Sequence, residues 1–393
     1  MKFKVLFCFC VSLVLVASFA TAQIPCGPTV IPPVTLSVNW PQFHFDAAHS
    51  GCNPYESILS TSTVGDLALN WEFLAIGTIE SSPAVANGMV YIGSEDHQIY
   101  ALSASTGARV WQYDTGFQVD YSPAFANGMV YVSHYDQNRF KSFVVALNAT
   151  TGAVIWQSEL PNLVIGFAPT IANGVLYTFG GAGTIAAVNA GTGQLLWESD
   201  DIDANAYPPT VANGMVYVST ANQNFYALDA KTGDVVWMVP VEGGAYTPTV
   251  INGVVYTGNF STYALDAKTG ALLWSVPTGP TACATNAACG PAVALGIVYV
   301  QSDEGVWALD ASTGGVLWRN RTSGSASSPS VANGVVYVGA HDQNIYALDP
   351  HTGIVLWNYT TNAVVNSSPA IANGMVFTGS EDGNVYAFHL PGH

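Results

Sequence analysis

Residues 227–237 read Ala-Leu-Asp-Ala-Lys-Thr-Gly-Asp-Val-Val-Trp, and this phrase recurs along the chain with small changes. An earlier tryptophan, Trp71, belongs to the same series, and close variants of the phrase end at Trp111, Trp156, Trp197, Trp274, Trp318 and Trp357. Neighbouring members of the series are 37 to 45 residues apart. Self-similarity at a period of about 40 residues indicates an array of small structural units.

A second marker, Asn-Gly, keeps phase with the tryptophans. It occurs at 87–88, 127–128, 173–174, 213–214, 252–253, 333–334 and 373–374, and Leu295-Gly296 takes the remaining place. Asn-Gly between apolar, β-branched runs favours a type I′ hairpin, because both turn residues need a positive φ. Each unit is therefore predicted to contain four short strands, which in the first unit are residues 83–86, 89–93, 99–102 and 109–113.

Four strands in each repeat of about 40 residues are typical of a β-propeller blade. Trp71 has no preceding strands, whereas the last unit, 367–390, lacks its fourth strand. Joined, these two ends complete one blade, so the N-terminal strand around Trp71 closes the ring and removes exposed sheet edges. We therefore predict an all-β, eight-bladed propeller over residues 67–390, preceded by an irregular lead-in over 23–66.

The N-terminus has the features of a signal peptide. Lys2 and Lys4 precede the apolar run 5–19, and Ala20-Thr21-Ala22 forms a small-x-small cleavage site. We expect residues 1–22 to be removed and the mature chain to be exported, to a periplasm or to the cell exterior. No later run of 18 apolar residues predicts a membrane span.

Four cysteines remain after the expected cleavage: Cys26, Cys52, Cys283 and Cys289. An even set in an oxidising compartment favours two disulfides. Proximity in sequence favours Cys26 with Cys52 and Cys283 with Cys289, although four cysteines allow three pairings. The formal net charge of −17 argues against nucleic acid and anionic membranes as partners.

The repeated Ala-Leu-Asp-Ala-x-Thr-Gly-x-x-x-Trp phrase resembles the repeat of the pyrroloquinoline-quinone (PQQ) propellers. The opening Trp40-Pro41-Gln42-Phe43, with Asp46 and His49-Ser50-Gly51, is similar to the lead-in of that superfamily, and the resemblance covers roughly residues 39–390. This resemblance implies a β-propeller with one of two kinds of function. The superfamily contains PQQ- and calcium-dependent dehydrogenases of alcohols or sugars, and it also contains non-catalytic members such as the outer-membrane barrel-assembly lipoprotein.

The loops that enter the innermost strand of each unit differ in residue type, and binding residues usually lie on such variable loops. Glu80, Asp120 and Asn366 place oxygens on three consecutive units, and the next arc is aromatic, with Tyr121, Phe167, Tyr207 and Tyr246. We expect all seven residues at the mouth of the channel, where they could hold a cation and a flat or sugar-like ligand. In the alternative, the tyrosines pack between loops and the acids are solvated.

PQQ carries three carboxylates, so its site needs basic side chains, calcium or both. Three basic residues adjoin the tight Thr-Gly turns on the other face and four fall outside the inner ring: Arg109, Lys231 and Lys268, then Arg139, Lys141, Arg319 and Arg321. We therefore favour a monomeric, non-catalytic binding or scaffold module for a protein, small-molecule or carbohydrate ligand. If the protein is instead a PQQ- and calcium-dependent dehydrogenase, Glu80 and Asn366 would bind the metal and Asp120 would be the catalytic base.

Two further groups of polar residues have a structural and a functional interpretation. His44, Asp46 and His49 could be metal ligands, but we expect them in a lead-in that covers a blade. Acidic residues also recur in the loops between the second and third strands, at Glu95-Asp96, Asp303-Glu304, Asp342 and Glu381-Asp382. We attribute these acids to ordinary hairpin chemistry.

Overall fold

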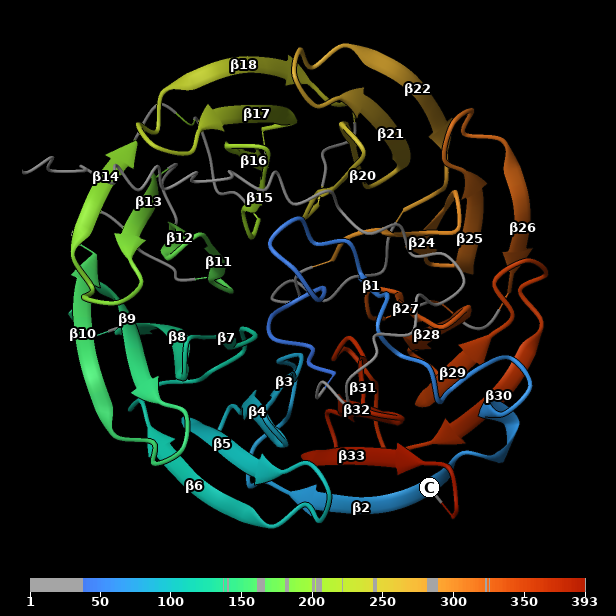
Figure 1. Ribbon diagram of the computed structural model, residues 1–393. Coiled ribbons are helices and arrows are strands. Elements are labelled where there is room, and N and C mark those ends of the chain that lie inside the picture. The colour runs from blue at the N-terminus through green and yellow to red at the C-terminus, as the bar shows by residue number, and fades with distance from the viewer. Residues whose placement is uncertain are drawn as a thin grey trace, which may run out of the picture.

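The computed structural model describes residues 38–136, 138–139, 141–160, 167–180, 184–199, 202, 207–220, 222–242, 246–280, 289–321, 324 and 326–392. Eight β-sheets surround a central axis in these residues (Figure 1). The predicted all-β, eight-bladed propeller is thus confirmed. The expected signal peptide lies outside the described residues, as do Cys26 and Cys283, so both proposed disulfide pairings stay predictions.

Each blade is a four-stranded antiparallel sheet whose strands are named A to D from the axis outward. Blade 1 has β3 (Ala84–Ala86), β4 (Met89–Gly93), β5 (Gln98–Ser103) and β6 (Arg109–Asp114). Blade 2 has β7 (Ala124–Ala126), β8 (Met129–Asp136), β9 (Lys141–Asn148) and β10 (Val154–Leu160). Blade 3 has β11 (Thr170–Ala172), β12 (Val175–Gly180), β13 (Thr184–Asn189) and β14 (Leu195–Ser199). Blade 4 has β15 (Thr210–Ala212), β16 (Met215–Ser219), β17 (Asn224–Asp229) and β18 (Val235–Pro240).

The second half of the ring repeats this pattern and ends in a composite blade. Blade 5 has β19 (Thr249–Ile251), β20 (Val254–Gly258), β21 (Ser261–Asp266) and β22 (Leu272–Pro277). Blade 6 has β23 (Ala292–Ala294), β24 (Ile297–Ser302), β25 (Gly305–Asp310) and β26 (Val316–Asn320). Blade 7 has β27 (Ser330–Ala332), β28 (Val335–Gly339), β29 (Asn344–Leu348) and β30 (Val355–Thr360), with β1 (Cys52–Asn53) added parallel to β27. Blade 8 has β31 (Ala370–Ala372), β32 (Met375–Gly379), β33 (Asn384–His389) and β2 (Ala68–Leu74), and the 3-10 helix η1 (Val64–Asp66) precedes β2.

The Asn-Gly pairs make the tight turns between strands A and B. Asn87 and Gly88 have φ values of 53° and 75°, as a type I′ hairpin requires. Leu295 and Gly296 adopt the same conformation, with φ values of 57° and 74°, although leucine lacks the tolerance of asparagine for this region. The repeat position therefore imposes the turn even where the sequence signal is incomplete.

The tryptophans of the strands D join neighbouring blades. Trp111 Nε1 donates to the carbonyl oxygen of Ala149 in the next blade at 2.9 Å, and Tyr91 Oη donates to the same oxygen at 3.1 Å. The indole also lies against the glycine of the next Thr-Gly turn, where a Cβ on Gly152 would approach Trp111 Cδ2 to 2.8 Å. The repeated phrase thus combines a large buried ring with a backbone that leaves room for it.

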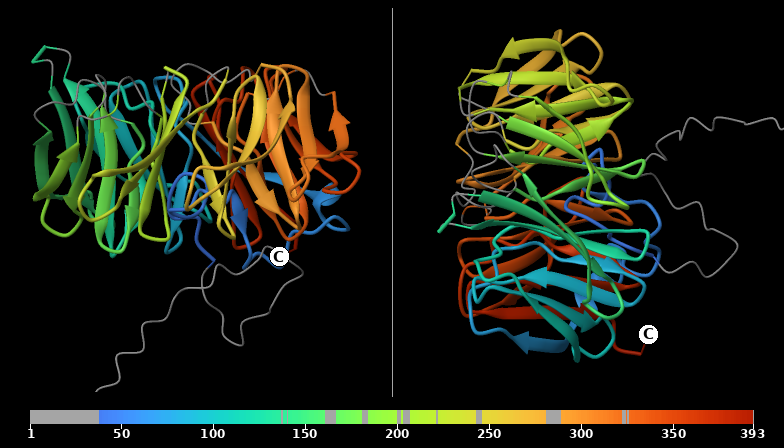
Figure 2. Two further views of the ribbon diagram at one scale, coloured as in Figure 1. Left: turned by 90° about the horizontal axis from the view of Figure 1, so that it is seen from above. Right: turned by 90° about the vertical axis from the view of Figure 1, so that its left-hand side faces the viewer.

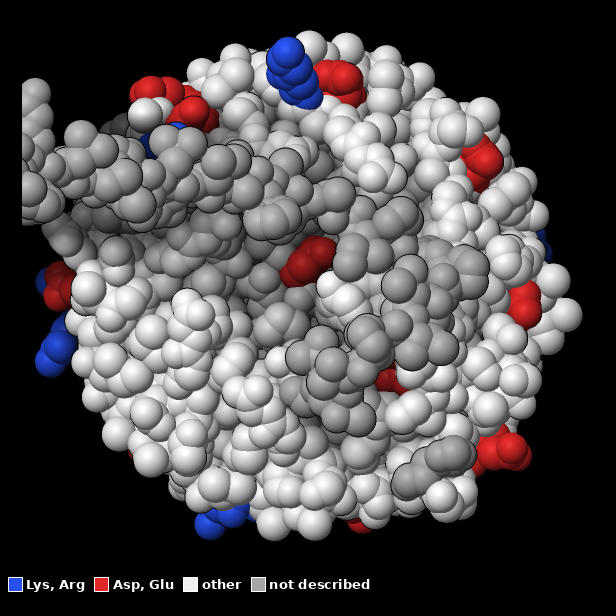
Figure 3. Space-filling view, viewed as in Figure 1, with Lys and Arg blue, Asp and Glu red and all other residues white. Residues whose placement is uncertain are grey.

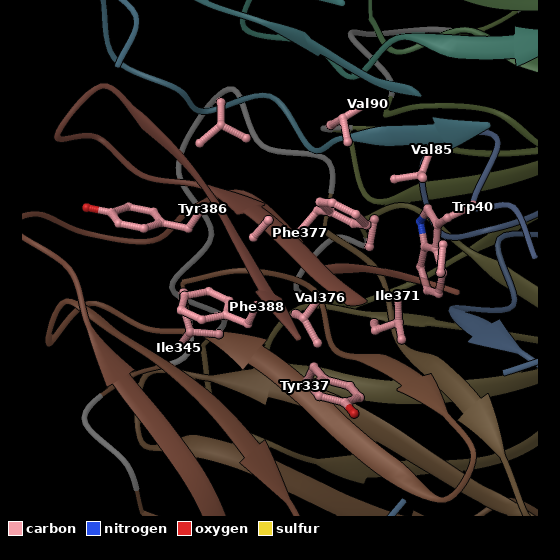
Figure 4. Packing of buried hydrophobic residues seen from close by; sticks show 14 of the residues in the cluster. Trp40, Val85, Val90, Tyr337, Ile345, Ile371, Val376, Phe377, Tyr386 and Phe388 are labelled. Carbon is pink, nitrogen blue, oxygen red and sulfur yellow. The ribbon is translucent and has the colours of Figure 1, made fainter. Parts of the chain in front are cut away.

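A tryptophan hydrogen bond of this kind also joins blade 7 to the composite blade 8, where the ring closes. Strand β2 pairs with β33 so that Trp71 lies opposite Ala387, and Trp357 Nε1 of blade 7 donates to the oxygen of Leu67 at 2.9 Å. Figure 4 shows the buried cluster at this junction, in which Trp40 lies beside Val85 and Ile371. Two ends of the chain that are distant in sequence therefore share one core.

The lead-in fills the central channel, which corrects the expectation that its His44–His49 part covers a blade. Residues 40–53 follow the strands A around the axis, and this segment is visible in blue at the centre of Figure 1. Its hydrogen bonds join one partner in each strand A, in the order Trp40–Val85, Pro41–Phe125, Gln42–Ile171, Ala47–Val211, Ala48–Val250, Ser50–Val293, Gly51–Val331 and Asn53–Ile371. The backbone groups at the inner edges of all eight sheets thereby gain partners.

The lead-in enters and leaves the channel beside the Asn-Gly turns. Asn39 Oδ1 accepts from Asn87 N at 3.2 Å, and Asn333 Nδ2 donates to Leu59 O at 2.8 Å. Figure 2 shows the blue lead-in and the C-terminus on the same side of the disk. The D–A and B–C loops occupy the other side, so the lead-in forms the floor of the mouth there. None of the helices in the described part of the chain is long and apolar enough to cross a membrane.

Candidate functional site at the channel mouth

A chain of hydrogen bonds holds the D–A loops together at one rim. Ser82 N donates to Ser122 Oγ at 3.0 Å, and Ser368 N donates to Ser82 Oγ at 2.9 Å. The chain continues where Ser328 N donates to Ser368 Oγ at 3.1 Å and Gly290 N donates to Ser328 Oγ at 3.0 Å. Three of these serines, at 82, 122 and 368, lie two residues after a predicted site position, so Glu80, Asp120 and Asn366 occupy equivalent places on adjacent blades.

The B–C loops bring more acidic side chains beside these D–A loops. Ile79 N donates to Ser380 O at 3.2 Å, which sets Glu381 beside Glu80. Val119 N donates to Ser94 O at 3.2 Å, which sets Glu95 beside Asp120. Glu381, Glu80, Glu95 and Asp120 therefore form one acidic arc that runs over blades 8, 1 and 2. His341 has the equivalent B–C position on blade 7, and Val365 N donates to Ala340 O there at 3.3 Å.

The sequence predicts a hairpin role for both acids of each Glu-Asp pair in the B–C loops. In the structure the two acids, such as Glu95 and Asp96, have different roles. The second acid is structural, since Asp96 accepts from Gln98 N at 3.1 Å and from Tyr100 Oη at 2.6 Å. Asp382 repeats this pattern with Tyr386 Oη at 2.7 Å. The first acid belongs to the acidic arc. The tripeptide Ser-Glu-Asp occurs on blade 1, which carries Glu80, and on the adjacent blade 8. This recurrence is the sequence signal that could have identified the first acid as part of the site.

Three carboxyl groups of the acidic arc, those of Glu80, Asp120 and Glu381, have raised pKa values. Burial, followed by the charges of Asp120, Glu95 and Glu381, raises the pKa of Glu80 to about 7. Burial and the charge of Glu95 raise the pKa of Asp120 to about 6. The pKa of Glu381 is also raised, chiefly by burial, although His341 opposes the shift. Glu80 and Asp120 thus change their charge near neutral pH.

Several oxygens at this rim are buried without a hydrogen-bond partner among the described residues. They are Glu80 Oε2, Asp120 Oδ1 and Asn366 Oδ1. Asn366 is only 4% exposed, and its Nδ2 donates to Glu381 Oε1 at 2.5 Å. Buried acceptors without donors are costly, and they are typical of sites that bind a ligand, an ion or water.

The predicted aromatic arc consists of two separate pairs. Tyr121 and Phe167 lie with ring centroids 5.0 Å apart, and Tyr207 and Tyr246 meet edge to face at 4.9 Å. Burial, followed by the charges of Asp120 and Glu80, raises the pKa of the Tyr121 hydroxyl, so the first pair adjoins the acidic arc. Burial raises the pKa of Tyr207 to about 12.

The floor of the mouth contains two buried histidines that have ring nitrogens close to hydroxyl or backbone oxygens. His49 lies between two hydroxyls, with Nε2 3.1 Å from Thr170 Oγ1 and Nδ1 2.8 Å from Thr210 Oγ1. His44 Nδ1 lies 3.3 Å from His49 O, and Asp46 accepts from Ser50 N at 2.9 Å. Within the described ranges, no three His, Cys, Asp or Glu side chains converge closely enough to hold a metal ion.

Several basic residues bind partners away from the mouth. Arg139 pairs with Asp136 at 3.5 Å, Lys141 pairs with Glu159, and Arg319 lies 3.5 Å above the Trp307 ring. On the side that Figure 3 shows, the Lys and Arg side chains lie near the edge of the disk. The described side chains of the acidic arc therefore do not fit a ligand with three carboxylates, because they would repel it.

Comparison with known proteins gives two groups of relatives. The family model described as outer membrane protein assembly factor BamB matches residues 59–143, 140–259 and 258–391. Quinoprotein alcohol dehydrogenase PedH of Pseudomonas putida is 29% identical over 166 residues, which are 38% of this chain and 28% of that protein. The chain thus matches little more than a quarter of that dehydrogenase.

Two solved structures show the fold in both groups. BamB from Moraxella catarrhalis superposes with a TM-score of 0.65 and 18% identity, over 82% of this chain and 99% of that one. Quinohemoprotein alcohol dehydrogenase from Comamonas testosteroni gives a TM-score of 0.75 and 17% identity, over 91% of this chain and 81% of that one. These similarities show the architecture alone, because one propeller serves several unrelated chemistries.

Proposed function

This chain belongs to the family of outer membrane protein assembly factor BamB, and on that premise we propose that it is a non-catalytic binding or scaffold module. Its partner would bind at the face formed by the D–A and B–C loops. The observation that carries the proposal is the acidic arc at the mouth, whose described side chains do not fit the three carboxylates of PQQ. A rigid ring with variable loops on one face is also a suitable scaffold for recognition.

One observation favours a second candidate, a PQQ- and calcium-dependent dehydrogenase of alcohols or sugars. The unpartnered oxygens of Glu80, Asp120 and Asn366 lie on adjacent blades, and calcium prefers such ligands. In this case Glu80 and Asn366 would hold calcium, and the bound quinone would supply the oxidising chemistry. Asp120 would accept the hydroxyl proton, a role consistent with a pKa of about 6.

The two candidates differ in a direct binding experiment. Isothermal titration calorimetry of the purified protein with PQQ and CaCl2, and dye-linked oxidation of a panel of alcohols and sugars, test them together. We expect neither PQQ binding nor dye reduction. Stoichiometric PQQ binding that is lost in Glu80→Ala would overturn the proposal and support the dehydrogenase. A Glu72→Ala variant, altered at an exposed position of β2, is the control.

We also propose that the module works outside the cytoplasm as a monomer. The N-terminal features at residues 1–22 support export. The closed ring supports the monomer, because it leaves no blade without a neighbour. Mass spectrometry of protein secreted by its native host should find Gln23 as the first residue, and light scattering should give the mass of one chain. An N-terminus at Met1 would contradict the export proposal.

A further inference from the structure

The acidic arc combines negative side chains that alternate between two kinds of loop. Glu381 and Glu95 come from B–C loops, and Glu80 and Asp120 come from the D–A loops hydrogen-bonded to them. Their order around the rim is fixed by backbone and serine hydrogen bonds rather than by contacts between the carboxyls. The two ion pairs of the described residues, Arg139–Asp136 and Lys141–Glu159, lie outside the arc. The described part of the rim therefore concentrates negative charge on three blades, with His341 of blade 7 as a basic neighbour of Glu381.

Asn366 gives an independent indication of a ligand. Its side chain is almost completely buried, and its amide nitrogen is committed to Glu381 at 2.5 Å. Within the described ranges, the oxygen of the same amide has no donor, and neither does Glu80 Oε2 or Asp120 Oδ1. Acceptors thus exceed donors at this rim. A bound group that supplies several N–H donors would satisfy them.

The distribution of the acceptors distinguishes between a metal ion and a larger cation. A metal needs its ligands within a single short coordination sphere, and no three acidic or histidine side chains of the described chain converge in this way. An alkylammonium or guanidinium group carries several donors and can bridge oxygens that lie farther apart. The Tyr121–Phe167 pair adjoins Asp120 and offers aromatic surface for a cation or its alkyl chain.

We propose that the channel mouth binds an organic cation, with an alkylammonium or guanidinium group held by Glu80, Asp120 and Asn366 beside Tyr121. The proposal rests on the proposed function, since it names the ligand class of the same binding face. Two sources share this chemistry, namely a free polyamine and the basic side chains of a protein partner. Both would be recognised by charge and by donor number.

The experiment uses the mature full-length chain and calorimetry at constant ionic strength, in the absence of PQQ. The probes are spermidine, the peptide acetyl-Arg-Lys-Arg-amide, its neutral citrulline-norleucine counterpart, and CaCl2. We expect saturable binding of spermidine or the basic peptide at pH 8 and none of the neutral peptide. Binding should weaken about tenfold or more at pH 5, where Glu80 and Asp120 are protonated. Binding of spermidine alone would indicate a polyamine, and binding of the peptide alone would indicate a protein partner.

Variants separate a site from diffuse charge. Glu80→Gln and Asp120→Asn should each weaken binding about tenfold, whereas Asp66→Asn, on the exposed surface of η1, should leave it unchanged. Thermal unfolding shows whether Glu80→Gln or Asp120→Asn fails to fold. If one of them does, the binding affinity of the other tests the proposal. Equal weakening by Asp66→Asn, calcium binding without organic-cation binding, or no saturable binding would each overturn the inference. If no organic cation binds, the proposal of a non-catalytic module still stands. If PQQ binds in the separate calorimetry experiment, that proposal is overturned, and the organic-cation measurements, made without PQQ, are unaffected.

Discussion

In seven of the eight blades the indole nitrogen of the strand D tryptophan donates a hydrogen bond across the junction to the next blade. Trp111 Nε1 donates to Ala149 O in the next blade at 2.9 Å. Trp237 has the same position in blade 4, but its Nε1 is buried and has no acceptor in the part of the chain that the structure describes. The ring of Trp237 still packs on Gly270 of the next Thr-Gly turn, where a Cβ would lie 2.8 Å from its Cε3.

This difference predicts the outcome of two matched substitutions. Trp111→Phe removes ring area and a hydrogen bond, whereas Trp237→Phe removes a similar area and an unsatisfied donor. We expect Trp111→Phe to lower the free energy of unfolding by about 1 to 2 kcal/mol more than Trp237→Phe. Urea unfolding followed by circular dichroism measures both. Equal losses would show that the indole nitrogens contribute nothing beyond packing.

At the mouth, the ionisation of one carboxyl opposes folding. The pKa of Glu80 rises from 4.5 to about 7 in the folded protein, mainly through burial. The folded state therefore binds more protons than the unfolded state between these values. The contribution of Glu80 to stability is fully present below pH 4.5 and is lost as the pH rises through about 7.

Replacing Glu80 by Gln removes this dependence. We expect Glu80→Gln to be more stable than the wild type at pH 8, with an advantage that shrinks steadily as the pH falls toward 4.5. Chemical unfolding at several pH values measures the difference, and Glu72→Gln, an exposed change on β2, is the control. A difference that does not vary with pH would contradict the assignment of a raised pKa to this carboxyl.

At the scale of elements, the lead-in behaves as a ninth component of the ring. It makes hydrogen bonds to all eight strands A, and Gly51 shows how closely it fits. A Cβ at Gly51 would lie 2.6 Å from the Cβ of Ala292, and its φ is 66°. Burial lowers the pKa of His44 to about 3, and it lowers the pKa of His49 as well. The lead-in is therefore held in the channel with both imidazoles neutral.

The histidines make the lead-in sensitive to acid. In the unfolded chain both groups titrate near their ordinary value of 6.5, so the unfolded state binds more protons below that pH. Their contribution to stability is present above pH 6.5 and declines as the pH falls below it, for His44 as far as about pH 3. We expect His49→Gln to make this decline less steep, because one group that gains a proton on unfolding is removed. Unfolding between pH 6 and 4 tests this, and an unchanged slope, equal to that of the exposed control His351→Gln, would contradict it.

The repeated elements could be predicted from the sequence because each is determined locally. The Asn-Gly turns and the Trp71 strand follow from residues that are adjacent in the chain or in the repeat. The course of residues 40–53 could not be predicted, since every hydrogen bond that fixes it reaches a strand far away in sequence. For the same reason, the local hairpin pattern does not separate Glu95 and Glu381 from their aspartate neighbours, and only the recurrence of Ser-Glu-Asp on two adjacent blades marks their positions. The two acids of each pair are adjacent in sequence, yet one completes a hairpin and the other meets a neighbouring blade.

At the scale of the whole molecule, stability depends on closure. Strand β33 is hydrogen-bonded to β32 on one side and to β2 on the other, so it is the only connection between the two ends of the described chain within blade 8. Its Tyr386 and Phe388 are buried, and Phe388 packs against Trp357 of blade 7 with ring centroids 5.0 Å apart. Loss of β33 would expose two strand edges and open the ring.

Truncation tests this dependence with a control of the same design. Removing residues 384–393 deletes β33 and the free energy that its buried side chains contribute. We expect this loss to exceed the typical stability of a domain, about 5 to 15 kcal/mol. We expect this variant to aggregate or to unfold without a single cooperative transition. Removing only 391–393, which follow the last strand, should change the midpoint of urea unfolding little. If the longer truncation unfolded cooperatively at the wild-type midpoint, each blade would be stable on its own, and closure by Trp71 and its strand would organise the ring without stabilising it.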